Sequence, residues 1–235
     1  MDLFSRQRMF LMARRSLAEG KDAKLLRAAE EQRQQGFGWR WDGLGDWSTE
    51  AIFAKLQELG ADTDLVRFPT QARDAGRCAV LERRWCDQTE ERDDGWGEFL
   101  FFAVQELWRR LTPDVLCPEI VADLLEAGIR RAREDQSLSR EEVLASMRQA
   151  TTRLMDYLEG LPPEQRDEAL SEVDAFGVMD VRQWLMDSIV VLGESDTDAA
   201  IRVADLMSKI EQPVNYQSDL ALILAMAGRE DEALL

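Results

Sequence analysis

Apolar residues recur at helical spacing along almost the whole chain. Near the start, Phe10, Ala13 and Leu17 follow this rule, since side chains three and four residues apart share one face of an α-helix. No window shows the strict apolar–polar alternation of a half-buried strand, and the β-branched residues 189–191 lie within a helical stripe. The pattern therefore predicts an all-α protein with almost no strand.

Glycine, proline and capping residues mark where the predicted helices begin and end. The segment 98–111 is apolar around most of its circumference, so we expect this helix to be central and buried. Asp62 or Thr63 is expected to start a short helix that Pro69 bends or divides. The longer predicted helices are 5–19, 21–35, 48–59, 98–111, 118–131, 140–159 and 164–176.

One pattern occurs twice between residues 180 and 235. In each copy a leucine lies eight residues before a glycine, and an alanine opens the helix that follows. The repeat length of about 35 residues is that of a two-helix unit whose apolar face needs a neighbouring unit to cover it. The recurring residues are Leu185, Ile189, Gly193 and either Ala199 or Ala200 in the first copy, and Leu220, Leu224, Gly228 and Ala233 in the second.

The second copy resembles a tetratricopeptide repeat. The resemblance rests on the series Leu220, Ala221, Leu224, Gly228, Glu232 and Ala233, and Pro213 falls where that family commonly ends a unit. It implies antiparallel helix pairs stacked into an α-solenoid-like array. The segments before it are similar to uncharacterised bacterial helical proteins, some of which carry a cysteine-rich SEC-C metal-binding tail. This sequence shows no such tail, so the resemblance implies no metal.

Gly160 and the pair Pro162–Pro163 mark the predicted domain boundary. We expect an N-terminal helical bundle at 1–160 and a helical-repeat region at 161–235. The last repeat stops just inside its second helix, and an unfinished unit exposes an apolar edge. This suggests either a truncated chain or a homodimer that covers the C-terminal edge.

The charge of the chain limits its partners. Its 46 acidic and 29 basic residues give a formal net charge of −17, which repels nucleic-acid phosphates and anionic lipid. The N-terminal basic residues are interrupted by acids and are typical of a solvated helix face, so neither nucleic acid nor membrane is expected as a partner. The apolar run near the start is too short for a signal peptide, and a cytoplasmic location is expected.

The residues available for chemistry are few. The chain has no histidine and three cysteines, which excludes Ser–His and Cys–His nucleophile pairs and mixed His/Cys zinc sites. Cys78 and Cys86 are expected on one helix face, buried as small hydrophobic residues. The glycines of 36–45 follow no predicted strand, so no phosphate-binding loop is expected. We predict no catalytic residue, no metal site and no cofactor.

The most unusual segment is GFGWRWDGLGDW, residues 36–47, which is expected to be non-helical. Its candidate partner-binding residues are Trp39, Arg40, Trp41 and Trp47, because tryptophan and arginine dominate binding hot spots. The alternative is that these rings fold inward and cover the open end of the helical array.

Two functional hypotheses follow from the sequence. The first is a non-catalytic helical-repeat protein that binds a protein or peptide on its concave face or its aromatic segment. The alternative is an enzyme, or a protein that binds a small ligand or a metal, with carboxylates in a cleft between the two parts. A raised carboxyl pKa in a closed pocket would favour the alternative.

Overall fold

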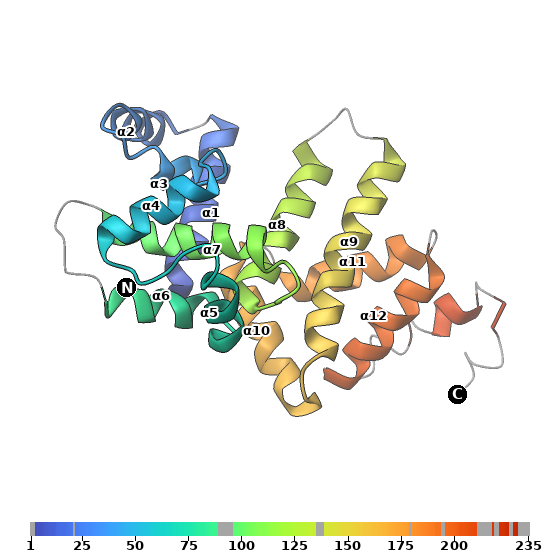
Figure 1. Ribbon diagram of the computed structural model, residues 1–235. Coiled ribbons are helices and arrows are strands. Elements are labelled where there is room, and N and C mark those ends of the chain that lie inside the picture. The colour runs from blue at the N-terminus through green and yellow to red at the C-terminus, as the bar shows by residue number, and fades with distance from the viewer. Residues whose placement is uncertain are drawn as a thin grey trace. The chain divides into compact units, whose positions relative to one another are not determined.

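The computed structural model describes residues 3–20, 22–88, 96–134, 139–178, 180–193, 196–210, 218, 221–225 and 228–229. Every regular element in these ranges is a helix and none is a strand, which confirms the predicted all-α class (Figure 1). The elements are α1 (Leu3–Glu19), α2 (Ala23–Gln34), α3 (Trp39–Asp42), α4 (Thr49–Leu59), α5 (Phe68–Ala75), α6 (Cys78–Cys86), η1 (Trp96–Glu98), α7 (Phe99–Leu111), α8 (Pro118–Glu134), α9 (Arg140–Glu159), η2 (Pro163–Gln165), α10 (Arg166–Phe176), α11 (Val181–Gly193) and α12 (Thr197–Ile210).

The chain divides into two compact units, Met1–Ile120 and Val121–Leu235. The first unit ends well before residue 160, where the sequence predicts a domain boundary. Helix α9, which precedes that predicted boundary, packs against α10, α11 and α12, which follow it. The Pro162–Pro163 pair therefore lies within the second compact unit, in the turn that leads into α10.

Helix α7 is the centre of the first unit. It packs against α4, α5, α6 and η1. The side chains of Phe99, Leu107 and Trp108 are completely inaccessible to solvent. This confirms the expectation that the apolar segment 98–111 is a buried central helix.

Two helix ends carry clear stop and start residues, and one predicted helix start is corrected. Gly60 ends α4 with a φ of 96°, a left-handed conformation that favours glycine, and Ser139 forms a capping box with Glu142 at the start of α9. The short helix expected from Asp62 begins only at Phe68. Pro69 occupies the first turn of α5, where proline needs no hydrogen-bond donor, and residues 61–67 form a turn instead.

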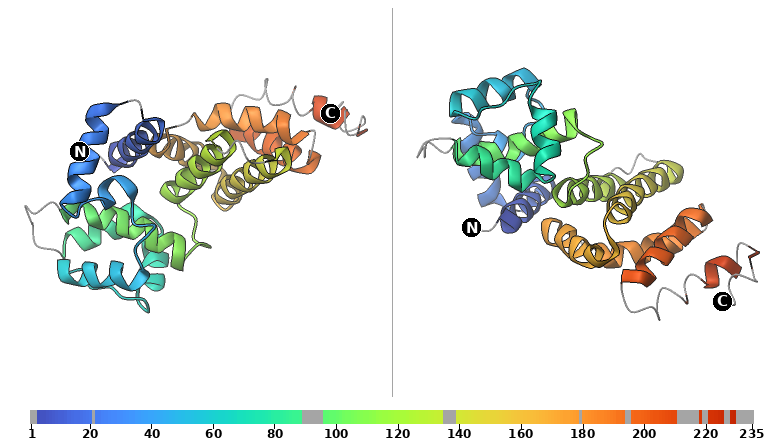
Figure 2. Two further views of the ribbon diagram at one scale, coloured as in Figure 1. Left: turned by 90° about the horizontal axis from the view of Figure 1, so that it is seen from above. Right: turned by 60° about the horizontal axis from the view of Figure 1, so that its bottom comes forward.

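Helices α9, α11 and α12 form the core of the second unit. In Figures 1 and 2, α11 and α12 lie side by side, and both pack against α9. Leu185 and Ile189 of the first predicted repeat are buried in α11, which ends at Gly193, and Ala200 is buried in α12.

The second predicted repeat is only partly described. Residues 221–225 are helical, and Gly228 has a φ of 72°. Leu220, Glu232, Ala233 and Pro213 lie outside the described residues. The packing of a helix pair is therefore established, whereas the repeat array remains a prediction.

Leu154 tests the core of the second unit, because its side chain on α9 is fully buried. Leu154→Ala should lower the free energy of unfolding by about 2–5 kcal/mol, through lost apolar burial and the cavity that remains. Arg153→Ala, at the exposed neighbouring position, should change it by less than about 0.5 kcal/mol. Urea unfolding followed by circular dichroism measures both, and equal effects would contradict the assigned packing of α9.

Candidate functional site

The tryptophan-rich segment 36–47 packs inward. Trp39 is 3% exposed, stacks on Trp96 with ring centroids 5.4 Å apart and meets Phe99 and Phe102 edge-on, each at 5.5 Å. Contrary to the predicted non-helical conformation, residues 39–42 form a short helix, α3. The reason is tertiary: one helical turn places Trp39 against Phe99 and Phe102 of α7, while Trp41, about 200° further round the helix, contacts Gln32 of α2.

Polar contacts to α2 fix α3 in place. The guanidinium group of Arg33 donates two hydrogen bonds to the carboxylate of Asp42, at 2.9 and 2.6 Å. The indole N–H of Trp41 donates to Gln32 Oε1 at 2.8 Å. The hydrogen bonds from Arg33 lower the pKa of the Asp42 carboxyl group, so the pair stays ionised at neutral pH.

Arg110 holds the loop that follows α3. This α7 side chain donates to the carbonyl oxygens of Leu44 at 3.1 Å, Gly45 at 3.0 Å and Trp47 at 2.7 Å. It also contacts Glu106, one helical turn earlier, at 2.7 Å. One planar guanidinium thus satisfies three loop carbonyls. Sequence reasoning missed this residue, although a charged Glu–Arg pair in the otherwise apolar α7 was an available signal.

The four predicted partner-binding residues differ in exposure. Trp39 is buried, so its ring is not accessible to a partner in this conformation, whereas Arg40, Trp41 and Trp47 are half-buried. Arg40 lies over the rings of Phe37 and Trp39 at 5.1 and 5.5 Å. These positions agree with the inward-facing interpretation of the segment. Partner binding by Arg40, Trp41 and Trp47 stays a prediction.

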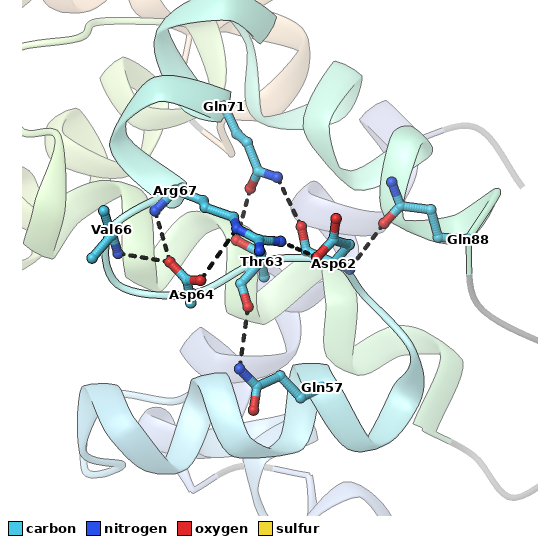
Figure 3. A network of polar contacts seen from close by, with 8 residues as sticks. All are labelled: Gln57, Asp62, Thr63, Asp64, Val66, Arg67, Gln71 and Gln88. Carbon is cyan, nitrogen blue, oxygen red and sulfur yellow. Dashed lines mark hydrogen bonds and ion pairs between the residues drawn. The ribbon is translucent and has the colours of Figure 1, made fainter.

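A second candidate site is the turn at residues 61–67, whose polar contacts are drawn in Figure 3. Asp64 Oδ1 accepts hydrogen bonds from the backbone N–H groups of Val66 at 2.9 Å and Arg67 at 2.8 Å. Gln71 of α5 donates to the carbonyl oxygen of Asp62 at 2.9 Å and accepts from the hydroxyl of Thr63 at 2.7 Å. These contacts bind the turn to the first turns of α5.

Contacts from two other helical segments complete this network (Figure 3). Gln57 of α4 donates to the carbonyl oxygen of Thr63 at 3.4 Å. The backbone N–H of Asp62 donates to the side chain of Gln88, just after α6, at 3.0 Å. Arg67 also pairs with the carboxylate of Asp62. The turn is thus held from α4, α5 and the end of α6 at once.

Two large apolar side chains project from this turn. Leu65 is 53% exposed and Val66 is 84% exposed. A single exposed apolar residue is ordinary on a protein surface. Two adjacent ones on a turn fixed by side-chain hydrogen bonds form a preorganised apolar contact, which we call the 65–66 tip.

The cysteines depart in part from the prediction. Cys78 is buried, as expected, but Cys86 at the other end of α6 is exposed, so the expectation of a shared buried face is wrong for Cys86. Eight residues along a helix turn the side chain by about 800°, or 80° beyond two full turns. That rotation moves Cys86 off the face that Cys78 occupies. The buried partner of Cys78 is Cys117, with the Sγ atoms 3.7 Å apart.

The carboxyl groups of Glu106 and Asp114 have lowered pKa values because each is paired with arginine. Burial alone would raise the pKa of Glu106, but Arg109 and Arg110 outweigh it and leave this pKa lowered. The pKa of Asp114 is lowered by its hydrogen bond with Arg73. Within the described ranges, no group of three Cys, Asp or Glu side chains could hold a metal ion.

Comparisons of this chain with models of protein families, with curated proteins and with solved structures find no match. The described fold alone therefore defines the class, an all-α protein of packed helix pairs. None of the described helices combines the length and apolarity needed to cross a bilayer.

Arg110→Lys tests the anchoring of loop 44–47, because lysine keeps the charge but cannot reach three carbonyls with a planar fork. We expect the free energy of unfolding to fall by about 1–3 kcal/mol, with faster amide hydrogen exchange at 44–49. Arg84→Lys, at an exposed position on α6, is the control. Unchanged exchange in Arg110→Lys would show that the loop does not depend on this side chain.

Asp42→Asn tests the pair with Arg33. Because the folded pKa of Asp42 is lowered, its stabilising contribution is fully present above the ordinary carboxyl pKa of 3.8 and is lost as the pH falls through the lower folded value. The Arg33 and Asp42 side chains are 39% and 45% exposed, so we expect a difference below about 1 kcal/mol. Denaturant unfolding of the wild type and of Asp42→Asn at several pH values from 7 downwards should show a difference that is largest at pH 7 and shrinks as the pH falls below 3.8.

Proposed function

We propose that this protein is a non-catalytic helical interaction protein that binds a protein or peptide. The observation that carries the proposal is the 65–66 tip. Its apolar side chains are largely exposed, Leu65 by 53% and Val66 by 84%. Polar contacts from Gln57, Gln71 and Gln88 fix the backbone beneath them. A preorganised apolar contact loses little conformational entropy on binding, which favours affinity.

The packing in the second unit supports the finer proposal of a helical array. Helices α11 and α12 form a side-by-side pair, and Ile223 of the next helical segment lies 3.5 Å from the position of a Cβ on Gly193. A third helical segment against a helix pair is the arrangement that tetratricopeptide-like stacking requires. A homodimer through the C-terminal edge is part of the same proposal.

The alternative function uses carboxylates for catalysis or ligand binding. A general acid at neutral pH needs a raised carboxyl pKa. The carboxyl groups of Asp42, Glu106 and Asp114 shift the other way, because each is paired with arginine. These shifts give the alternative no support.

A comparative capture experiment tests the interaction proposal. The full chain is immobilised as the wild type, as Leu65→Ser/Val66→Ser and as Val190→Ser, and bound proteins are quantified by mass spectrometry. Val190 is 64% exposed on α11, so it matches the apolar loss at another surface. We expect the 65–66 variant alone to lose its partner about tenfold, the equivalent of about 1.4 kcal/mol.

An additional variant, Arg40→Ala/Trp41→Ala, examines the predicted aromatic site in the same assay. Loss of the same partner would extend the contact surface to α3. Equal amounts of bound protein from all four chains would contradict both sites.

A further inference from the structure

Two thiols face each other inside the first unit. Cys78 Sγ and Cys117 Sγ lie 3.7 Å apart, although the residues are 39 positions apart in the sequence. Their side chains are 2% and 1% exposed. The sulfur–sulfur bond of a disulfide is about 2.0 Å long, so the two atoms are within about 2 Å of bonding distance.

Both cysteines lie at the start of a helix. Cys78 is the first residue of α6, and Cys117 directly precedes Pro118, the first residue of α8. The partial positive charge of a helix N-terminus favours thiolate. Burial acts in the opposite direction and, with the Cys117 contact, raises the pKa of the Cys78 thiol well above its usual range. The Cys78 thiol is therefore protonated at neutral pH, and the burial of both sulfurs favours small oxidants.

We propose that Cys78 and Cys117 form an oxidisable dithiol that hydrogen peroxide converts into an intrachain disulfide. The thiolate is the nucleophile, so one thiol first releases its proton. Its sulfur then attacks a peroxide oxygen and becomes a sulfenic acid as the O–O bond breaks, and the departing hydroxide takes up a proton and leaves as the first water. The second sulfur then attacks the sulfenic sulfur, forms the S–S bond and displaces the hydroxyl group as a second water. Two electrons pass from the sulfurs to the peroxide, and the two thiol protons leave in the water molecules.

The disulfide closes a covalent loop over residues 78–117, which contains α6 and α7. Because α7 is the central helix of the first unit, the bond links the start of α6 to the start of α8 across the core. Such a bond restricts the unfolded chain and stabilises the folded one. We expect peroxide treatment to raise the melting temperature of the first unit by about 5–10 °C.

Cys86 supplies an internal control. It is exposed at the far end of α6, about 12 Å along the helix axis from Cys78, so it cannot join the same bond without unfolding of α6. Exposed thiols are the ones that oxidise most readily to intermolecular disulfides. Cys86→Ser removes this side reaction and leaves the buried pair intact.

The test treats the full-length Cys86→Ser chain with hydrogen peroxide under native conditions. Blocked, non-reduced peptide mapping should reveal one linked pair of peptides, containing Cys78 and Cys117, and the protein should lose the mass of two hydrogen atoms. The same chain with Cys117→Ala added should form no such link and show no rise in melting temperature. Dithiothreitol should reverse both changes.

Two outcomes would overturn the proposal. One is native Cys86→Ser protein that keeps two free thiols, or accumulates sulfinic acid, at peroxide concentrations that oxidise Cys86 in the wild type. The other is a Cys78–Cys117 link that appears only in denaturant. Both readouts use a chain with the buried pair unchanged, so a folding defect of Cys117→Ala does not affect them.

Discussion

The first unit depends on the burial of α7, a helix that is apolar around most of its circumference. A helix of this kind must be covered on every side, since each exposed apolar side chain costs about 1.5–3 kcal/mol relative to burial. Helices α4, α5 and α6 cover part of α7. Aromatic side chains of the 36–47 segment cover another part, with Trp39 in contact with Phe99 and Phe102. The aromatic composition of the 36–47 segment thus matches the apolar surface of α7 that it covers.

When a glycine-rich loop covers a helix, its carbonyl oxygens lose contact with bulk water. They then need hydrogen-bond donors from the protein. Arg110 supplies them, since its long side chain leaves the apolar face of α7 and its guanidinium reaches three carbonyls of residues 44–47. The same division of roles recurs at the 61–67 turn, where glutamine and aspartate side chains satisfy the backbone. The loop 44–47 is thus fixed by a polar side chain of α7, and the turn 61–67 by its own Asp64 together with side chains of neighbouring helices.

Features local in sequence were predictable, and features that join distant residues were not. The helical class and the buried α7 follow from spacing within a few residues, and the structure confirms them. The pairing of Cys78 with Cys117 and the role of Arg110 depend on contacts between residues more than twenty positions apart. The exposed Cys86 was mispredicted because eight residues turn an α-helix 80° beyond two full turns, which moves its side chain off the face of Cys78. The tryptophan segment was ambiguous, because the same residues suit a hot spot and a core.

The net charge of the chain also limits which partners can approach its surface. Several arginines are already paired inside the chain: Arg33 with Asp42, Arg67 with Asp62, and Arg202 with Asp156 and Glu159. These arginines are neutralised by carboxylates of the same chain. The net charge of −17 means that many other carboxylates have no basic residue to balance them. At long range this field attracts basic surfaces and repels acidic ones, chiefly through the association rate. An apolar contact at the 65–66 tip would add binding affinity at short range, which long-range electrostatic attraction does not supply. A partner that combines a small apolar recess with a basic rim therefore fits both properties of this surface.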